Sequence, residues 1–287
     1  MARHQVFLPS RMLPKDRYNG LNLSFEPSEE DIEIIRDAFL VSSSCEILPN
    51  LIRQIGSLSE RGKVYDSLIK QIPVAIKVFD NTGHGNIAKF YHEREINEMI
   101  TMYGDSDFFL RYLTGKICQE GKNSIGLIVM ERAIGDLKQI ITYSVINNHF
   151  LDETFSSVVA CLFEMAELDI YHGDLHCGNI FTVLRNGKLK IVLGDFGESE
   201  YRNDSPNNSE RDFYKFISTL RELITGVNRY NVFLKKLNIM FAVYAQIAKT
   251  IEFEFDEMIH SGLSPSQASK QCNINFLTVI WENYLSL

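Results

Sequence analysis

Three polar side chains near the middle of the chain have the types and the spacing that phosphoryl transfer requires. The segment HGDLHCGNIF carries Asp174 and Asn179 in a D-x-x-x-x-N pattern, and the later GDFG carries Asp195. Transfer of a γ-phosphoryl group needs a divalent cation to neutralise charge on the phosphate oxygens, and a carboxylate near the incoming hydroxyl. Asn179 and Asp195 can supply oxygen ligands to the cation, which leaves Asp174 as a separate base.

The sequence between these residues predicts the element that brings them together. Two apolar runs in FTVLRNGKLKIVLG flank the pair Asn186-Gly187, which is typical of a two-residue β-hairpin turn. A hairpin over this stretch folds Asp195 back beside Asn179.

These motifs resemble those of the protein kinase superfamily, H-R-D-x-x-x-x-N and D-F-G. The resemblance covers roughly residues 50 to 230. It implies that Asp174 orients the attacking hydroxyl and finally accepts its proton, and that Asn179 and Asp195 hold Mg²⁺ or Mn²⁺ on the phosphates of ATP. It also implies that His172 is structural and packs against Phe196.

Two residues of this loop depart from the usual kinase pattern. Gly173 stands where many kinases have an arginine that pairs with a phosphorylated activation segment, so we do not expect activation by loop phosphorylation. His176 stands where protein kinases usually have a lysine that contacts the transferring phosphate, and its imidazole could supply a donor instead. The form D-L-H-x-G-N also resembles haspin-like kinases and aminoglycoside phosphotransferases, which leaves the substrate class open.

An upstream apolar run, VAIKVF, contains Lys77. Taken alone, a lysine there would reach solvent at a strand edge, but V-A-I-K resembles the kinase strand whose lysine pairs with the α- and β-phosphates. The implied acidic partner lies on the helix FYHEREINEMITMY. We select Glu95, because it can face the strand while Met99 packs behind it, and we expect Glu93 and Glu98 to be solvated.

The segment IGSLSERGKVY resembles a glycine-rich phosphate loop in which some glycines are replaced. Gly56 and Gly62 remain, and Val64 closes the loop. Ser57 and Ser59 can still offer backbone N–H groups and hydroxyls to phosphate. The alternative is an ordinary hairpin turn.

The segment LIVMERAIGDL resembles the strand and hinge that join the two lobes of a kinase. Met130 would border the pocket behind adenine, while Glu131 and Ala133 would present backbone groups to its edge. Asp136 would lie near the ribose, or would instead be the N-cap of the next helix. The ATP-binding residues implied by the resemblance in and beside this region are Ala75, Met130, Glu131, Ala133, Asp136 and Phe181.

Together these assignments predict an α+β fold with the two lobes of a kinase. Residues 1–45 would form an N-terminal extension with one helix, residues 46–133 a β-rich N-lobe with the hinge, and residues 134–287 a mainly helical C-lobe. The pattern D-x9-E-L-x-T-G that starts at Asp212 resembles a kinase C-lobe helix. However, Asp195 and Asp212 are only 17 residues apart (212 − 195 = 17), about half the usual separation, and A-P-E is absent. We therefore expect a truncated activation segment, with ESEYRNDSPNNSE as an exposed, mobile loop.

The N-terminal extension contains one clear helical pattern, SEEDIEIIRDAFL. Ser28 can cap it, and Ile32, Ile35 and Phe39 recur at helical spacing. We expect this helix to dock on the main domain as a structural extension, with a partner or regulatory helix as the alternative.

The overall composition excludes several classes. With 45% hydrophobic and 23% charged residues the chain is typical of globular proteins, and a net charge of −8 argues against a general nucleic-acid binder. We expect no membrane span, because no run reaches the ~18 apolar residues required, and there is no apolar signal region near the N-terminus. The five cysteines lack a C-x-x-C pair and are expected to be free thiols. A cytoplasmic or nuclear location follows, or the host cytoplasm if the chain is a viral or bacterial effector protein.

The leading functional hypothesis is a kinase that depends on ATP and a divalent metal and phosphorylates serine or threonine of a protein substrate, with an activating or host partner protein possible. One alternative is a small-molecule kinase of the aminoglycoside or choline type. The other is a nucleotide-binding pseudokinase scaffold whose altered glycine loop no longer aligns the γ-phosphate.

Overall fold

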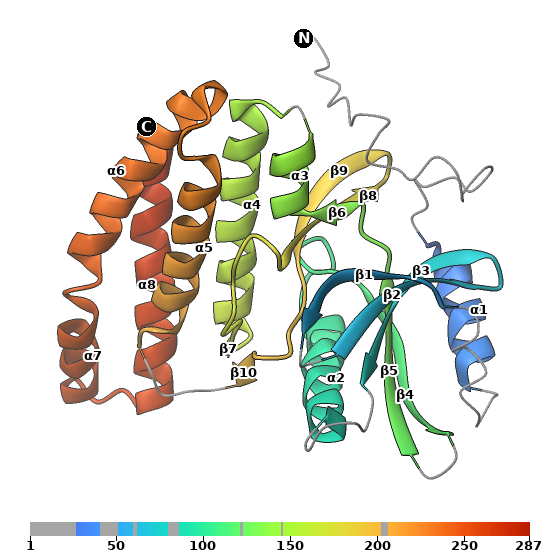
Figure 1. The fold of residues 1–287 in the computed structure, drawn as a ribbon. Helices are drawn as coiled ribbons and strands as arrows, with labels where there is room; N and C mark the ends of the chain where they lie inside the picture. The colour runs from blue at the N-terminus through green and yellow to red at the C-terminus, as the bar shows by residue number, and fades with distance from the viewer. Residues whose placement is uncertain are drawn as a thin grey trace.

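A computed structural model describes residues 27–40, 51–59, 62–79, 86–120, 123–144, 146–201 and 206–287 of the chain. In this part a five-stranded antiparallel sheet is followed by a mainly helical half (Figure 1). The α+β class expected from the sequence is therefore confirmed.

The first sheet has the strand order β1-β2-β3-β5-β4, with every neighbouring pair antiparallel. Side chains of β3 alternate between its two faces: Val74 and Ile76 belong to one apolar cluster, whereas Phe79 packs in another with Phe90 of α2. Lys77 points to the second face, where it meets α2. The elements of this half are β1 (Leu51–Ser59), β2 (Gly62–Ile69), β3 (Ile72–Phe79), α2 (Asn86–Tyr103), β4 (Tyr112–Glu120) and β5 (Asn123–Glu131).

Helix α1 (Glu29–Leu40) covers the face of the sheet opposite to α2. Its start is capped by Ser28, whose hydroxyl accepts a hydrogen bond from the Asp31 N–H at 3.1 Å. Ile35 and Phe39 are fully buried in the sheet cluster, and Lys116 of β4 donates a hydrogen bond to the Phe39 carbonyl at 2.7 Å. The predicted cap and the predicted docking of this helix are both confirmed.

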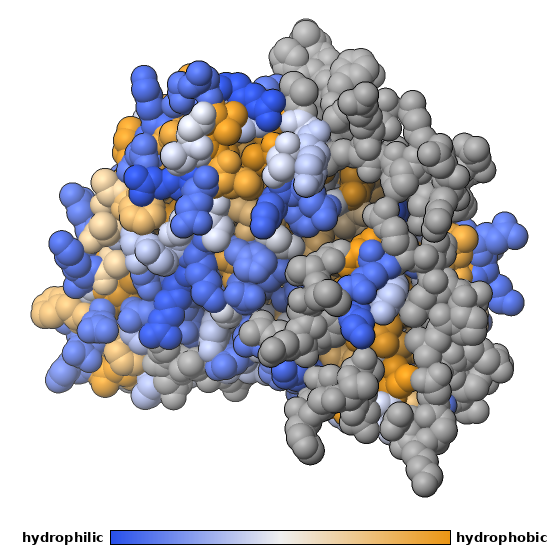
Figure 2. All heavy atoms as spheres, in the orientation of Figure 1, coloured by the Kyte–Doolittle hydropathy of each residue, from blue (hydrophilic) through white to orange (hydrophobic). Residues whose placement is uncertain are grey.

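The second half is built around α4, which lies among α5, α6 and α8 (Figure 1). Apolar residues of α4 recur at helical spacing and are buried; Phe155 packs against Phe213 and Phe216 of α5. On the face shown in Figure 2, the surface of these helices is mainly hydrophilic with some apolar patches. The helices are α3 (Leu137–Tyr143), α4 (Asn148–Glu167), α5 (Asn208–Ile224), α6 (Asn231–Ile247), α7 (Ile251–His260) and α8 (Pro265–Leu285), with a 3₁₀ turn at Asn228–Tyr230.

Short strands lie between the first sheet and the helices. They are β6 (Gly135–Asp136), β7 (Ile170–Tyr171), β8 (Ile180–Arg185), β9 (Lys188–Leu193) and β10 (Glu200–Tyr201). Strands β6, β8 and β9 form one small sheet, and β7 pairs with β10. The loop before β4 joins this region to the first sheet, because the Leu110 N–H donates to the Leu193 carbonyl at 2.7 Å.

The expectation that all cysteines are free thiols is wrong for Cys118, which is buried in β4 and disulfide-bonded. The absence of a C-x-x-C pair excludes only a local bridge, since residues distant in sequence can meet in space. Cys161, Cys177 and Cys272 are buried free thiols. Of the helices described, none combines the length and the apolar character needed to cross a membrane.

Candidate active site

The hairpin predicted between Asn179 and Asp195 is confirmed. Strands β8 and β9 pair antiparallel along their full lengths, and Asn186 and Gly187 have φ of 51° and 68°, the left-handed backbone that a type I′ turn requires. At the open end of the hairpin the Gly194 N–H donates to the Asn179 carbonyl at 3.1 Å. Asp195 therefore follows directly beside Asn179.

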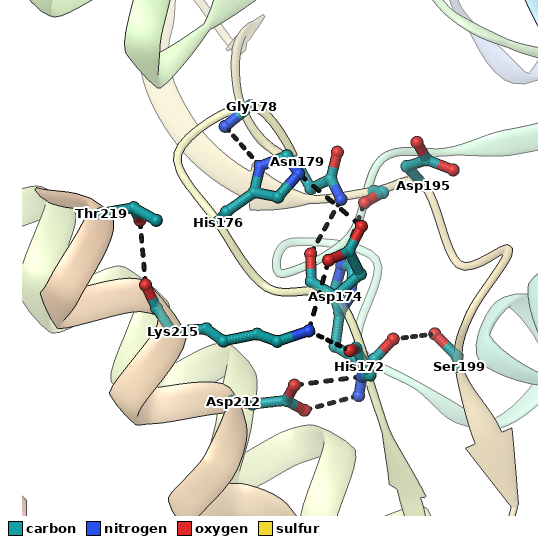
Figure 3. A network of polar contacts seen from close by, with 12 residues as sticks. His172, Asp174, His176, Gly178, Asn179, Asp195, Ser199, Asp212, Lys215 and Thr219 are labelled. Carbon is teal, nitrogen blue, oxygen red and sulfur yellow. Dashed lines mark hydrogen bonds and ion pairs between the residues drawn. The ribbon is translucent and has the colours of Figure 1, made fainter. Parts of the chain in front are cut away.

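The loop that carries Asp174 is held from below by Asp212 of α5 (Figure 3). The Asp212 carboxylate accepts hydrogen bonds from the backbone N–H groups of His172 at 2.6 Å and Gly173 at 3.0 Å. Burial raises the pKa of this carboxyl to about 7, and the two N–H donors pull it in the opposite direction. The predicted helix motif thus supplies the anchor of the loop, a role that the sequence analysis did not assign.

Gly173 is required by the path of the backbone. Its φ is +76°, and a Cβ at this position would lie 2.1 Å from the Glu198 carbonyl oxygen. By sequence, this glycine marks the place of an arginine that many kinases have. The structure adds a steric reason, because the segment after Asp195 passes too close for any side chain here.

His172 has the structural position predicted for it. Its ring lies 5.4 Å from the Phe196 ring, centroid to centroid, and its Nε2 is 3.1 Å from the Gly194 carbonyl oxygen. Burial lowers the pKa of His172 below its ordinary value, so the ring favours the neutral form. It links the Asp174 loop to the turn that carries Asp195.

Two basic side chains flank Asp174 (Figure 3). Lys215 of α5 places its Nζ 3.3 Å from Asp174 Oδ1 and 2.6 Å from the Gly173 carbonyl oxygen. His176 Nε2 lies 3.7 Å from Asp174 Oδ2, while its Nδ1 accepts the Gly178 N–H at 2.9 Å. The predicted His176 is therefore present at the site, together with Lys215, which the sequence analysis missed.

Lys77 lies at the centre of a buried ion network between the two halves of the structure. Its Nζ is 2.6 Å from Glu93 Oε2 and 2.6 Å from Asp195 Oδ1. Burial alone would lower the pKa of Lys77, but the two carboxylates outweigh it and raise that pKa above its ordinary value. Burial raises the pKa of Glu93, and Lys77 opposes this shift. Strand β3, helix α2 and the turn after β9 therefore converge on one ammonium group.

The choice of Glu95 as partner of Lys77 is wrong, and Glu93 takes that place. One face of α2 carries the buried residues Phe90, Glu93, Asn97 and Ile100 at helical spacing. Glu95 lies outside this face and is exposed. The spacing from Phe90 was the sequence signal that could have identified Glu93.

Asn179 and Asp195 fit a divalent cation in their chemistry and orientation. The Asn179 amide donates through Nδ2 to the Asp174 carbonyl at 2.9 Å, which turns its oxygen away from that contact. Asp195 adopts φ 63°, which is uncommon outside glycine, and its side chain is 47% exposed. Such oxygens suit Mg²⁺, which keeps water and phosphate oxygens as further ligands. The described residues contain no cluster of three or more His, Cys, Asp or Glu side chains that could hold a metal ion.

Several residues expected at the ATP pocket share one apolar cluster. Met130 is buried there, and Ala133 and Phe181 pack against it. Ala75 is buried on β3 directly opposite Met130 in the strand register. Asp136 caps α3 by accepting the Gln139 N–H at 2.7 Å, so the N-cap alternative is confirmed for this residue.

The side chain of Glu131 has a structural role beyond the hinge position predicted for it. It is buried and forms an ion pair with Arg185, the last residue of β8. Arg185 also donates to the backbone carbonyls of Ser106 and Phe109. Since the Glu131 N–H donates to the Arg111 carbonyl at 2.9 Å, that backbone donor is already occupied.

The predicted phosphate loop falls on the β1–β2 hairpin. Gly56, Ser57 and Ser59 belong to β1 and Gly62 opens β2, with Ser59 paired to Gly62 after a register irregularity. Val64 pairs with Lys77 of β3. Residues 60–61 lie outside the described part, and this hairpin suits both the phosphate-loop and the ordinary-turn interpretation.

The start of the segment after Asp195 is packed against its neighbours, contrary to the exposed loop expected there. Ser199 is fully buried; its hydroxyl donates to the His172 carbonyl, and its own carbonyl lies 2.7 Å from His92 Nε2 of α2. Tyr201 of β10 donates a hydrogen bond to the Glu95 carbonyl at 3.3 Å. These hydrogen bonds hold residues 199–201 between the Asp174 loop and α2. Residues 202–205 of the predicted loop are outside the described part.

The structure thus brings Lys77, Asp174, Asn179, His176 and Asp195 to one region and leaves Glu95 outside it. The chain matches no known protein-family model and no curated protein sequence. The assignment of chemistry therefore rests on the residues and their geometry.

Proposed function

We propose that this chain is a protein kinase that uses ATP and a divalent metal to phosphorylate serine or threonine hydroxyls of a protein substrate. The observation that carries the proposal is the buried contact of Lys77 with both Glu93 and Asp195 at 2.6 Å. Burying the ammonium of a strand lysine costs free energy unless the charge is paired and hydrogen-bonded. A cation held at this point, next to oxygen ligands and a separate carboxylate, suits the phosphates of a nucleotide.

In this proposal each half of the structure contributes one part of a two-lobed active site. The sheet half supplies Lys77 for the α- and β-phosphates, and the apolar cluster around Met130 receives adenine. The helical half supplies Asp174 to orient the hydroxyl and take up its proton. Asn179 and Asp195 would hold the metal, which neutralises charge on the phosphate oxygens when bound.

A protein substrate is favoured over a small molecule by α5. Its Asp212 anchors the Asp174 loop through two backbone N–H groups, within the D-x9-E-L-x-T-G pattern that resembles a protein-kinase helix. The small-molecule alternative is favoured by the short path between Tyr201 and Asn208, where β10 ends and α5 begins. Six residues connect them (208 − 201 − 1 = 6), which gives little chain for a peptide platform.

Activity without activation-loop phosphorylation is part of the proposal. Gly173 offers no guanidinium to a phosphate. Instead, α2 is already tied to the segment after Asp195 by the His92–Ser199 contact at 2.7 Å and the Tyr201–Glu95 contact at 3.3 Å. These contacts hold Glu93 toward Lys77 without added charge.

Transfer from γ-labelled ATP tests the proposal. The purified chain is incubated with Mg²⁺ or Mn²⁺ and either generic protein substrates or a panel of aminoglycosides and small amino alcohols. We expect label in protein that disappears in Asp174→Ala and Asp195→Ala. Label that persists in both variants would refute the assigned site, label in small molecules alone would support the alternative, and tight ATP binding without any transfer would identify a scaffold.

A further inference from the structure

Lys215 projects from helix α5 toward the loop that carries Asp174. It lies on α5 one turn after Asp212, so both side chains project from the same helix face toward the loop. Asp212 holds the backbone of His172 and Gly173, and Lys215 continues to Asp174, with its Nζ 3.3 Å from Oδ1 (Figure 3). Its second contact, to the Gly173 carbonyl at 2.6 Å, fixes where the ammonium lies.

The neighbouring His176 does not bring the same charge. The Gly178 N–H donates to His176 Nδ1 at 2.9 Å, so Nδ1 acts as an acceptor and has no proton of its own. The ring is then neutral, with the N–H at Nε2, and this nitrogen stands 3.7 Å from Asp174 Oδ2. A neutral imidazole can donate a hydrogen bond, but it cannot supply a formal positive charge.

We propose that Lys215 is a positioning residue of the transfer reaction, and that it supplies from α5 the positive charge that His176 does not supply from the loop. This inference rests on the proposed function. In the reaction the substrate hydroxyl oxygen forms a bond to the γ-phosphorus, and the bond from that phosphorus to the β,γ-bridging oxygen breaks. ADP leaves with the electron pair, and the hydroxyl proton passes to the Asp174 carboxylate. Lys215 holds one oxygen of that carboxylate and stabilises its charge before the proton arrives.

A purely structural role for Lys215 predicts that loss of the ammonium lowers the melting temperature, whereas the exposure of the pair argues for little effect. Its side chain is 45% exposed and that of Asp174 is 33% exposed, and exposed ion pairs contribute little to folding. Loss of the ammonium should therefore leave the melting temperature nearly unchanged. An effect on kcat without an effect on stability would separate positioning from folding.

The experiment compares Lys215→Met, which keeps the length but removes the charge, with Lys215→Arg, which keeps the charge. Lys270→Met is the matched control, because Lys270 also contacts one carbonyl and one carboxylate, those of Glu167 at 2.8 Å and 3.1 Å, away from the site. Steady-state rates give kcat and KM for ATP in the full chain. We expect Lys215→Met to lower kcat by about 10- to 100-fold, the range of one charge-assisted contact. KM for ATP should stay within about twofold, Lys215→Arg should recover most of the rate, and Lys270→Met should equal wild type.

Two results would overturn the inference. One is a kcat of Lys215→Met within about twofold of wild type. The other is an equal loss in the Met and Arg variants together with a lower melting temperature, which would assign Lys215 to folding. If the unmodified chain transfers no phosphate, the proposed function fails and takes the inference with it. Equal transfer by wild type and Lys215→Met overturns the inference alone.

Discussion

Replacing Glu93 by glutamine tests which glutamate of α2 serves Lys77. Glutamine keeps the shape of Glu93, and its amide oxygen can still accept a hydrogen bond from Lys77, but the negative charge is lost. Glu95→Gln makes the same chemical change on the exposed side of the same helix. The two variants therefore differ only in whether the carboxylate faces Lys77.

The expected size of the effect follows from the burial of this pair. The Glu93 side chain is 1% exposed and contacts Lys77 Nζ at 2.6 Å. Water therefore cannot solvate the Lys77 ammonium when the carboxylate charge is lost. The substitution turns a buried ion pair into a hydrogen bond from a charged donor to a neutral acceptor, and a hydrogen bond with a charged group contributes about 1.5–3 kcal/mol in total. A loss of about 1–2 kcal/mol corresponds to about a 5- to 30-fold lower kcat/KM for ATP, whereas an exposed substitution such as Glu95→Gln should stay within about twofold.

Initial rates of transfer from labelled ATP, measured over a range of ATP concentrations, give both values of kcat/KM. Thermal unfolding by circular dichroism verifies that each variant is folded. A larger loss in Glu95→Gln than in Glu93→Gln would refute the geometry of α2. Unchanged activity in both variants would refute a role for this ion pair in ATP use.

Further predictions concern stability and are tested by urea unfolding. Gly173→Ala should lower the free energy of unfolding by about 2 kcal/mol or more, because φ is +76° and a Cβ would lie 2.1 Å from a carbonyl oxygen. Gly187→Ala has φ +68° with nothing within 4 Å and should cost only about 1 kcal/mol, so equal losses would contradict the steric argument. Arg185→Met should cost about 3–5 kcal/mol, since it leaves the Glu131 carboxylate buried without its ion-pair partner. Adding Glu131→Gln should restore part of this loss, and a single-variant cost below about 1 kcal/mol would show that the pair is not buried. The pKa of Asp212 is raised from 3.8 to about 7 in the folded chain, so the folded state binds more protons than the unfolded state between these values. Stability should then fall by about 2 kcal/mol from pH 5 to pH 7, and a fall that persists unchanged in Asp212→Asn would exclude this carboxyl as its cause.

The features that the sequence predicted well are local. The Asn186-Gly187 turn requires positive φ at two adjacent positions, and few residue pairs accept this, so the local sequence identified the hairpin between Asn179 and Asp195. The Ser28 cap and its helix follow from the same kind of short-range rule.

The features that the sequence analysis missed depend on contacts between distant segments. Lys215 and Arg185 look like ordinary charged residues until folding places one beside Asp174 and buries the other against Glu131. Glu93 and Glu95 have the same chemistry, and the orientation of α2 against β3, which the spacing from Phe90 indicates, distinguishes them. In each case the deciding information is which face of an element meets its neighbour, a property of tertiary packing that the side-chain type does not encode.

Mass spectrometry of phosphosites tests the central claim most directly. The full chain and its Asp174→Ala variant are each incubated with ATP, Mg²⁺ and a mixture of protein substrates, and the modified residues are mapped. The proposed function predicts phosphoserine or phosphothreonine, on the substrates or on the chain itself, with wild type only. The same phosphosites in the Asp174→Ala sample, or none in the wild-type sample, would contradict it.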